Sequence, residues 1–249
     1  MKTTPETLRA QFERLQLAFM REHYAEVLQQ AAQHQWTPEE ILDRLLAGEI
    51  QRRDDRALQR RMKAARFPFI KTLDDFDWSW PKKINRAQIQ HLFHLDWLPQ
   101  QGNVFFLGGV GLGKSHLALA LGYHACHQGY SVRWVTAIDL VNTLLAAQHA
   151  HHLQTELKAF LKPQLLALDE LGYMPIDKAG ADLLFQVISE RYERGAICIT
   201  SNKPFKQWAT LFNNDATMAS AILDRLLHHG EPVVIEGKSY RMKDRIEPV

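Results

Sequence analysis

The chain has 249 residues, of which 46% are hydrophobic and 23% are charged, as is usual for a globular protein that stays in solution. It contains no apolar run of membrane-spanning length, and its polar start lacks a secretory hydrophobic region, which argues against a membrane or secreted protein. The two cysteines, Cys126 and Cys198, are far apart and form no CxxC pair. We therefore expect a cytoplasmic protein with two buried, reduced thiols.

The first third of the sequence has the pattern of amphipathic helices. Thr3 and Glu6 have the spacing of a capping box, which predicts a helix start there. Apolar residues then recur at helical spacing, at Leu8, Phe12, Leu15 and Phe19. A second helix start follows, with Thr37 as N-cap, Pro38 in the first turn and Glu40 three residues after the cap. Its apolar stripe comprises Ile41, Leu42, Leu45, Leu46 and Ile50.

Basic residues are concentrated at the end of this second helix. Eight Lys and Arg residues lie between Arg52 and Lys71 against two acidic ones, although the whole chain carries a net charge of only +2. A basic helix face neutralises duplex phosphates without reading sequence, although a solvated surface helix has the same pattern. We predict contacts with double-stranded DNA for Arg52, Arg53, Arg56, Arg60, Arg61 and Lys63.

The remaining sequence alternates between short apolar strands and helices. The predicted strands are Val104–Leu107, Val132–Val135, Leu165–Leu168, Ala196–Thr200 and Val233–Ile235, with helices at Lys114–His127 and Gly180–Glu193 among those between them. Continuous apolar strands separated by helices favour an α/β fold with a parallel sheet covered on both faces. We predict a small helical, basic domain over residues 1–66, an irregular connector over 67–99 that includes a short helix near 86–95, and a core over 100–249.

A phosphate-binding loop follows the first predicted strand of the core. The pattern G-x-x-x-x-G-K-[ST] is matched by Gly108, Gly109, Val110, Gly111, Leu112, Gly113, Lys114 and Ser115. The glycines allow backbone N–H groups to close around phosphate oxygens, Lys114 reaches the β- and γ-phosphates, and the Ser115 hydroxyl can bind Mg²⁺. The helix that begins after this loop directs its positive end toward the anion. The sequence therefore predicts a nucleoside triphosphate site.

Two further strands end in polar residues that belong to such a site. Asp169 and Glu170 follow the third strand, and Asn202 follows the fourth. Since ligands of parallel sheets bind at the carboxyl ends of the strands, we expect all three near the phosphate loop. Asp169 is suited to hold Mg²⁺ together with Ser115, Glu170 to activate water, and Asn202 to touch the γ-phosphate or that water. With Lys114, these residues predict hydrolysis of the nucleotide.

The order of these motifs resembles the AAA+ ATPases of the DnaC helicase-loader group, and more closely the IstB-like helper proteins of transposition. The segments that carry the resemblance are the phosphate loop, Leu168-Asp169-Glu170-Leu171-Gly172-Tyr173, residues 181–186, Thr200-Ser201-Asn202, residues 221–228 and Gly237-Lys238-Ser239-Tyr240-Arg241. The resemblance covers nearly the whole chain. It implies an AAA+ fold with a five-stranded parallel sheet, ATP and Mg²⁺ as ligands, duplex DNA and a transposase as partners, and a role in transposition.

The resemblance also implies a ring or filament in which a neighbouring subunit completes each ATP site. Arg225 is then the best candidate for a catalytic arginine supplied in trans, and Arg241 is a weaker second candidate. Few residues follow the last predicted strand, so we expect no full C-terminal helical lid. Assembly is then expected to close the site in place of a lid.

Three other functions remain open from the sequence. A replicative helicase loader would have the same ATPase core, a small-molecule kinase would share the phosphate loop, and a scaffold would bind ATP without hydrolysing it. The basic helix favours the transposition helper, and Glu170 argues against a scaffold. The histidines at 149, 151 and 152 lack a matching set of carboxylates or thiolates, so we expect a solvated loop there and no metal.

Overall fold

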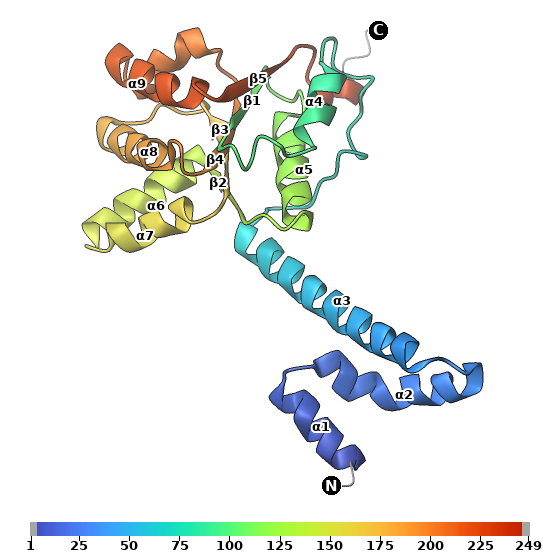
Figure 1. Cartoon of the computed structure of the whole chain (residues 1–249). Helices are drawn as coiled ribbons and strands as arrows, with labels where there is room; N and C mark the ends of the chain where they lie inside the picture. The colour runs from blue at the N-terminus through green and yellow to red at the C-terminus, as the bar shows by residue number, and fades with distance from the viewer. Residues whose placement is uncertain (1–3, 246–249) are drawn as a thin grey trace. The chain divides into compact units, whose positions relative to one another are not determined.

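The computed structural model describes residues 4–245, and contacts between residues divide the chain into two compact units, Met1–Arg60 and Arg61–Val249. Figure 1 shows a helical first unit and an α/β second unit, with one long helix, α3 (Pro38–Ala65), running through the division. Within the described residues, no helix combines the length and the apolar character needed to cross a bilayer.

The first unit contains α1 (Pro5–Arg14), α2 (Ala18–His34) and most of α3. The predicted cap residue Thr3 lies outside the described residues, and the capping box of α1 is formed by Thr4 and Thr7. The helical spacing of Leu8, Phe12, Leu15 and Phe19 does not correspond to a single helix, because Gln16 adopts a left-handed backbone conformation (φ 56°) and the chain turns between α1 and α2. Leu15 is consequently exposed instead of sharing an apolar stripe with Phe12.

The start of α3 is confirmed. The backbone N–H of Thr37 donates to the Glu40 carboxylate at 2.7 Å, and the N–H of Glu40 donates to the Thr37 hydroxyl at 3.3 Å. These reciprocal bonds satisfy two backbone donors that no helical carbonyl can reach. The apolar stripe of α3 is only partly packed: Leu45 is buried with residues of α2, whereas Leu42 and Leu46 remain at least half exposed.

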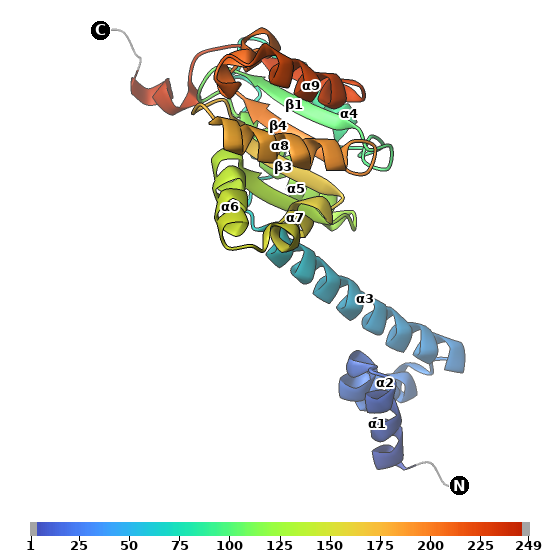
Figure 2. The ribbon, with the colours of Figure 1, turned by 90° about the vertical axis from the view of Figure 1, so that its left-hand side faces the viewer.

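The second unit is built on a five-stranded parallel sheet with the order β2-β3-β4-β1-β5. Helix α5 covers one face, and α6, α7, α8 and α9 cover the other (Figures 1 and 2). The strands are β1 (Asn103–Gly108), β2 (Val132–Thr136), β3 (Leu165–Leu171), β4 (Ala196–Ser201) and β5 (Gly230–Ile235). The helices are α4 (Arg86–Leu92), α5 (Lys114–His127), α6 (Ala137–His149), α7 (Leu153–Leu161), α8 (Lys178–Arg191) and α9 (Ala216–Leu227), with the 3₁₀ segments η1 (Phe205–Phe212) and η2 (Tyr240–Arg245).

All five predicted strands are confirmed, as is the parallel sheet with helices on both faces. The three central strands β3, β4 and β1 are buried along almost their whole length, as continuous apolar runs require. Both cysteines are buried and unpaired, and burial raises the pKa of the Cys126 thiol to about 11. This agrees with the expectation of two reduced thiols.

The stretch predicted to be an irregular connector packs closely against the α/β core. Its only regular helix, α4, is capped by Asn85, whose side chain accepts from the N–H of Gln88. Lys83 forms an isolated antiparallel bridge with Glu236, just beyond β5. Phe76 is buried and meets the ring of His116 edge-on, with 5.4 Å between ring centroids. The connector therefore forms one wall of the site described next.

Candidate functional site

The phosphate loop lies between the end of β1 and the start of α5. Gly111 (φ 73°) and Gly113 (φ 85°) adopt left-handed conformations that favour glycine. A Cβ at Gly113 would lie 2.6 Å from the Phe76 ring, and one at Gly111 would lie 2.1 Å from the Ser239 hydroxyl. The loop therefore requires glycine both for its backbone and for the close packing of its neighbours.

Lys114 is a buried cation beside this loop. Its Nζ donates to the carbonyl of Gly109 at 2.7 Å, and no carboxylate in the described residues lies within ion-pair distance of it. Burial lowers the pKa of Lys114, while the negative charge of Asp169 opposes that shift. An ammonium group has three donors, so a buried lysine with one acceptor is suited to bind an anion. The loop and Lys114 fit the phosphates of a nucleotide.

A chain of hydrogen bonds holds the two acidic residues at the carboxyl end of β3. The Ser115 hydroxyl donates to Oδ1 of Asp169 at 2.8 Å, and the Thr200 hydroxyl donates to the same oxygen. The Thr200 hydroxyl also accepts from the backbone N–H of Glu170 at 3.0 Å. Mg²⁺ prefers oxygen ligands, so the adjacent Ser115 and Asp169 oxygens fit the metal predicted from sequence.

A bulge in β3 gives Asp169 and Glu170 different environments. Leu168 pairs with Ile199 and Leu171 with Ser201, so Asp169 and Glu170 both lie opposite the single residue Thr200. Glu170 has a left-handed backbone (φ 60°), which is strained for a residue with a side chain. Asp169 is buried as a result, whereas Glu170 is exposed where water can reach it. No sequence pattern predicts this role of Thr200.

Asn202 follows β4, which lies between β1 and β3 in the sheet. It is thus placed between the phosphate loop and the acidic pair, and it lines a hollow that also includes Gly108 and Gly109. Its Oδ1 is inaccessible to solvent and has no hydrogen-bond partner. A buried polar atom without a partner is costly, so it marks a place where a ligand or water completes the structure.

A pocket of about 350 Å³ adjoins the phosphate loop. Aromatic side chains from the connector and from the core line it, namely Phe69, Phe76 and Trp80 from the connector and Tyr173 and Tyr240 from the core. The Trp80 indole donates to the carbonyl of Lys238 at 2.9 Å, and the N–H of Tyr240 donates to the carbonyl of Gly111. An aromatic pocket beside a phosphate loop suits a nucleotide base. Its residues are widely spaced in sequence, and sequence analysis missed them.

The two candidate arginines lie at opposite ends of the parallel strands. Arg241 lines the pocket beside Lys114, and its positive charge contributes to lowering the Lys114 pKa, after the larger effect of burial. Arg225 lies near Asn103 and Ile197, at the amino ends of β1 and β4. It donates to the carbonyl of Ala221 at 2.8 Å and stacks over the Phe185 ring. A strand of six residues separates these ends by roughly 15–20 Å. Arg225 is therefore remote from the phosphate loop of its own chain.

The predicted DNA-contacting residues are not equivalent. Arg52 forms a bidentate pair with Glu22, 30 residues away, which raises the pKa of Arg52, and Arg53 lies 3.5 Å from Glu49. Arg61 donates to the carbonyl of Cys126 at 2.9 Å. The others, Arg56, Arg60 and Lys63, are exposed and have no ion-pair partner in the described part of the chain.

The chain is similar to proteins of a known family. Residues 10–248 match the family model of the IstB-like ATP binding protein. The chain is 38% identical to the ATP-binding protein of insertion sequence IS5376 of Geobacillus stearothermophilus, over 93% of this chain and 92% of that protein. It is equally identical to the IS232 ATP-binding protein of Bacillus thuringiensis, over 98% and 97% of the two chains.

Solved structures show the fold. The DnaC helicase loader aligns with a TM-score of 0.54 at 24% identity, over 66% of this chain and 96% of that one. AMPPCP-bound DnaA from Aquifex aeolicus aligns with a TM-score of 0.55 at 21% identity, over 70% and 54% of the two chains. The second unit therefore has the AAA+ fold expected from the sequence. The chain belongs to the family of IstB-like ATP-binding proteins associated with insertion sequences.

Proposed function

We propose that this protein is an ATP-dependent helper of transposition, which assembles on duplex target DNA and presents it to a transposase. The observation that carries the proposal is the division of catalytic groups between the two edges of the sheet. The carboxyl edge holds Lys114, Ser115, Asp169, Glu170 and Asn202, whereas Arg225 lies at the opposite edge. A second copy of the chain is then needed to bring Arg225 to the site, in addition to the Arg241 that each chain already has there.

Within one site, Glu170 accepts a proton from a water molecule as the water oxygen attacks the γ-phosphorus of ATP. The bond between that phosphorus and the bridging oxygen breaks, and ADP and phosphate leave. Ser115 and Asp169 would hold Mg²⁺, which when bound would supply positive charge to offset that of the phosphates. Lys114 binds the phosphate oxygens, and Asn202 orients the attacking water through its unpaired Oδ1. Arg225 of the next subunit stabilises the charge on the transferred group.

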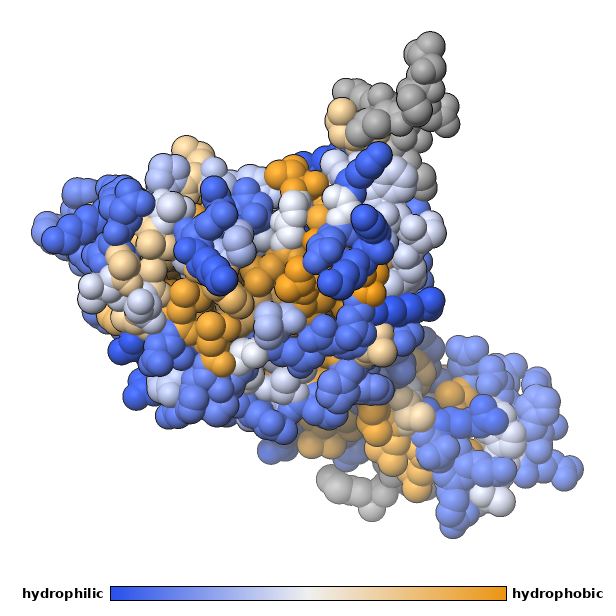
Figure 3. Space-filling model, turned by 90° about the horizontal axis from the view of Figure 1, so that it is seen from above, coloured by the Kyte–Doolittle hydropathy of each residue, from blue (hydrophilic) through white to orange (hydrophobic). Residues whose placement is uncertain are grey.

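The surface of the second unit supports self-assembly. Figure 3 shows apolar side chains grouped near the middle of one face of this unit, surrounded by hydrophilic residues. Large apolar side chains in the unit that are more than a third exposed include Val110, Tyr173, Met174, Val234, Tyr240 and Met242. Several of these belong to segments beside the nucleotide pocket, where a neighbouring subunit would cover them.

The exposed basic residues of α3 support binding to duplex DNA. Arg56 and Arg60 are one turn apart, so they lie on one face of the helix in the first unit. Lys63 follows on the same helix. Each cation that contacts a phosphate releases a counterion, so the affinity falls with salt concentration whatever the DNA sequence.

Sedimentation of the full-length chain with a random-sequence duplex tests the proposal. A large complex that requires both ATP and the duplex, in the presence of Mg²⁺, is the expected result. Purified transposase is then expected to sediment with that complex. A complex that forms on a replicative helicase and not on duplex DNA would instead favour the helicase loader, whose fold the chain shares.

A matched pair of variants locates the DNA contacts. R56A/R60A is expected to lower the slope of log affinity against log salt concentration by about two. R52A serves as the control, because Arg52 already pairs with Glu22 and its loss should leave the slope nearly unchanged. Equal slopes for R56A/R60A and the unmodified protein would contradict the assignment.

A further inference from the structure

Three potential metal ligands meet at the amino edge of the sheet, on the side away from the phosphate loop. Glu193 lies in the turn between α8 and β4, and His228 and His229 lie between α9 and β5. One ligand atom from each residue falls within 4.8 Å of those from the other two. The rings of His228 and His229 are 4.1 Å apart between centroids. No other group of three or more such residues is found in the described part of the chain.

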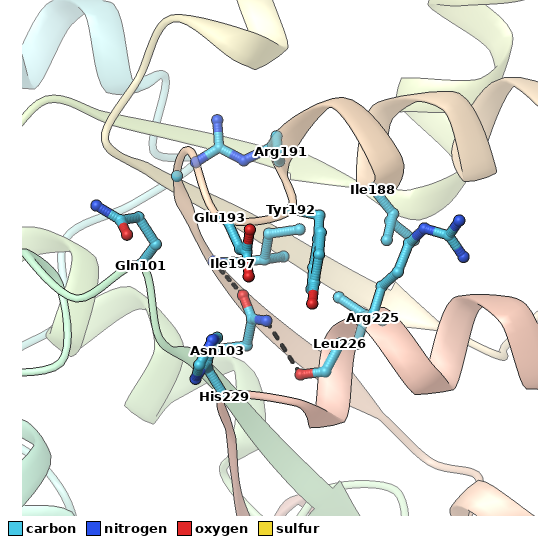
Figure 4. A pocket seen from close by; sticks show the side chains of 11 residues that line it. Gln101, Asn103, Ile188, Arg191, Tyr192, Glu193, Ile197, Arg225, Leu226 and His229 are labelled. Carbon is cyan, nitrogen blue, oxygen red and sulfur yellow. Dashed lines mark hydrogen bonds between the residues drawn. The ribbon is translucent and has the colours of Figure 1, made fainter.

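The two turns are held together by one buried side chain. The Asn103 amide donates to the carbonyl of Leu226 at 3.0 Å, and its oxygen accepts from the N–H of Ile197 at 3.0 Å. Figure 4 shows these two bonds joining the end of α9 to the start of β4. The N–H of Asn103 also donates to the carbonyl of His229. The backbone segments that carry the three ligands therefore have fixed positions relative to each other.

Nearby cations do not occupy the place between the ligands. The guanidinium of Arg191 is buried and donates to backbone carbonyls, including that of Ala196 at 2.7 Å. Burial lowers the pKa of Arg191 to about 10. In Figure 4 the guanidinium of Arg225 points away from the side chains of Glu193 and His229. Both arginines are thus directed elsewhere, and the carboxylate of Glu193 forms no ion pair in the described residues.

A hydrogen-bond partner for one ligand is already in place. The Tyr192 hydroxyl lies 2.9 Å from Nδ1 of His228 and forms a hydrogen bond with it. Nε2 of His228 is then the ring nitrogen left for a ligand. Histidines that bind metals typically hydrogen-bond through their second ring nitrogen, which fixes the orientation of the ring.

We propose that Glu193, His228 and His229 bind a divalent transition metal of the zinc class. Two imidazoles and one carboxylate are ligands that Zn²⁺ accepts, and three protein ligands leave a position for water or for a group from another molecule. The site lies three residues beyond Arg225, so a bound metal holds the end of α9 that carries this arginine. The proposal concerns binding of the metal and does not depend on whether ATP hydrolysis builds or dismantles an assembly of subunits.

Competition with a chromophoric zinc chelator tests the proposal on the full chain. Mg²⁺ and a non-hydrolysable ATP analogue are kept at saturation, so that Asp169 is not counted as a zinc ligand. One Zn²⁺ per chain is expected, and Co²⁺ in its place should give the visible absorption of a four-coordinate site. H228A/H229A should lose the bound metal, and Y192F should weaken binding by about 10-fold or more.

The matched control is H151A/H152A, which removes two histidines from a loop that has no third ligand nearby. It should retain one Zn²⁺ per chain with unchanged affinity. Circular dichroism and thermal melting without metal establish that each variant is folded, as expected for substitutions at exposed positions. The proposal is wrong if the unmodified chain binds no Zn²⁺, if H228A/H229A keeps it, or if H151A/H152A loses it.

Discussion

The carboxyl ends and the amino ends of the parallel strands carry different groups of the proposed ATP site. At the carboxyl ends of the strands, the glycine-rich loop and the buried Lys114 lie with Asp169, which accepts hydrogen bonds from Ser115 and Thr200. At the amino edge, Arg225 lies beside the starts of the same strands with no phosphate loop near it. Under the proposed function, one copy of the chain has both parts of the catalytic site, but at opposite ends of its strands.

This difference indicates how ATP could control assembly. Each half is held rigidly by contacts of its own, through Thr200 at one edge and Asn103 at the other. Two preorganised halves need only a suitable arrangement of subunits to form a complete site. Turnover should then report on assembly, and groups at the two edges should respond differently to mutation.

The largest effect is expected at the carboxyl edge, for Glu170→Gln. The amide cannot accept the proton of the attacking water, so the turnover number should fall by about 10²–10⁴-fold. ATP binding should persist, because Lys114 and the phosphate loop are unchanged. Single-turnover hydrolysis and nucleotide affinity, measured on the same sample, check this separation. A parallel loss of binding and turnover would show that Glu170 has a structural role instead.

A smaller effect is expected for Thr200→Val, which keeps the shape of the side chain but removes its hydroxyl. Asp169 and the N–H of Glu170 each lose a partner, at a cost of about 1–3 kcal/mol. If this loss of free energy destabilises the positions that Asp169 and Glu170 need for catalysis, turnover declines by about 10- to 100-fold. T200S keeps the hydroxyl and is the control. Equal turnover for the two variants would show that the Thr200 hydroxyl does not contribute to catalysis.

The smallest effect concerns His116, which joins the connector to α5 through a bond between its Nε2 and the carbonyl of Thr72. Burial lowers the pKa of His116 below its usual value of 6.5. The unfolded chain then binds a proton more readily than the folded one, so stability should decline as the pH falls below 6.5. Thermal melting of H116Q, which does not titrate, should show a weaker decline. An identical pH dependence in both proteins would contradict this assignment.

Local sequence patterns predicted the sheet, and the position of the glycine-rich loop between β1 and α5, well. Glycines at fixed spacing, followed by Lys114 and a helical apolar pattern, determine a loop whose residues are neighbours in the chain. Asp169 and Glu170 lie within the last residues of β3, beyond the predicted strand end at Leu168, and Asn202 follows β4. All three lie at the carboxyl ends of the strands, as predicted, because parallel strands share their direction. The parts that were predicted depend on short-range spacing and on one rule of topology.

Contacts between distant residues could not be predicted in this way. Gln16 turns the chain without a glycine or proline to signal it, so the break between α1 and α2 was missed. The pairing of Arg52 with Glu22 depends on how α2 packs against α3. The aromatic pocket combines Trp80 with Tyr240, which are 160 positions apart, and no local pattern indicates that their rings meet.

The most direct test of a shared site is a mixing experiment with E170Q and R225A. Each variant alone should hydrolyse ATP poorly in the presence of duplex DNA, since one lacks the base and the other lacks the arginine. In a mixed assembly, R225A subunits supply Glu170 and E170Q subunits supply Arg225, so about a quarter of the sites regain both groups if the subunits mix at random. Recovery of turnover upon mixing is the predicted result. No recovery from folded, assembling variants, or full activity of R225A alone, would contradict a site completed in trans.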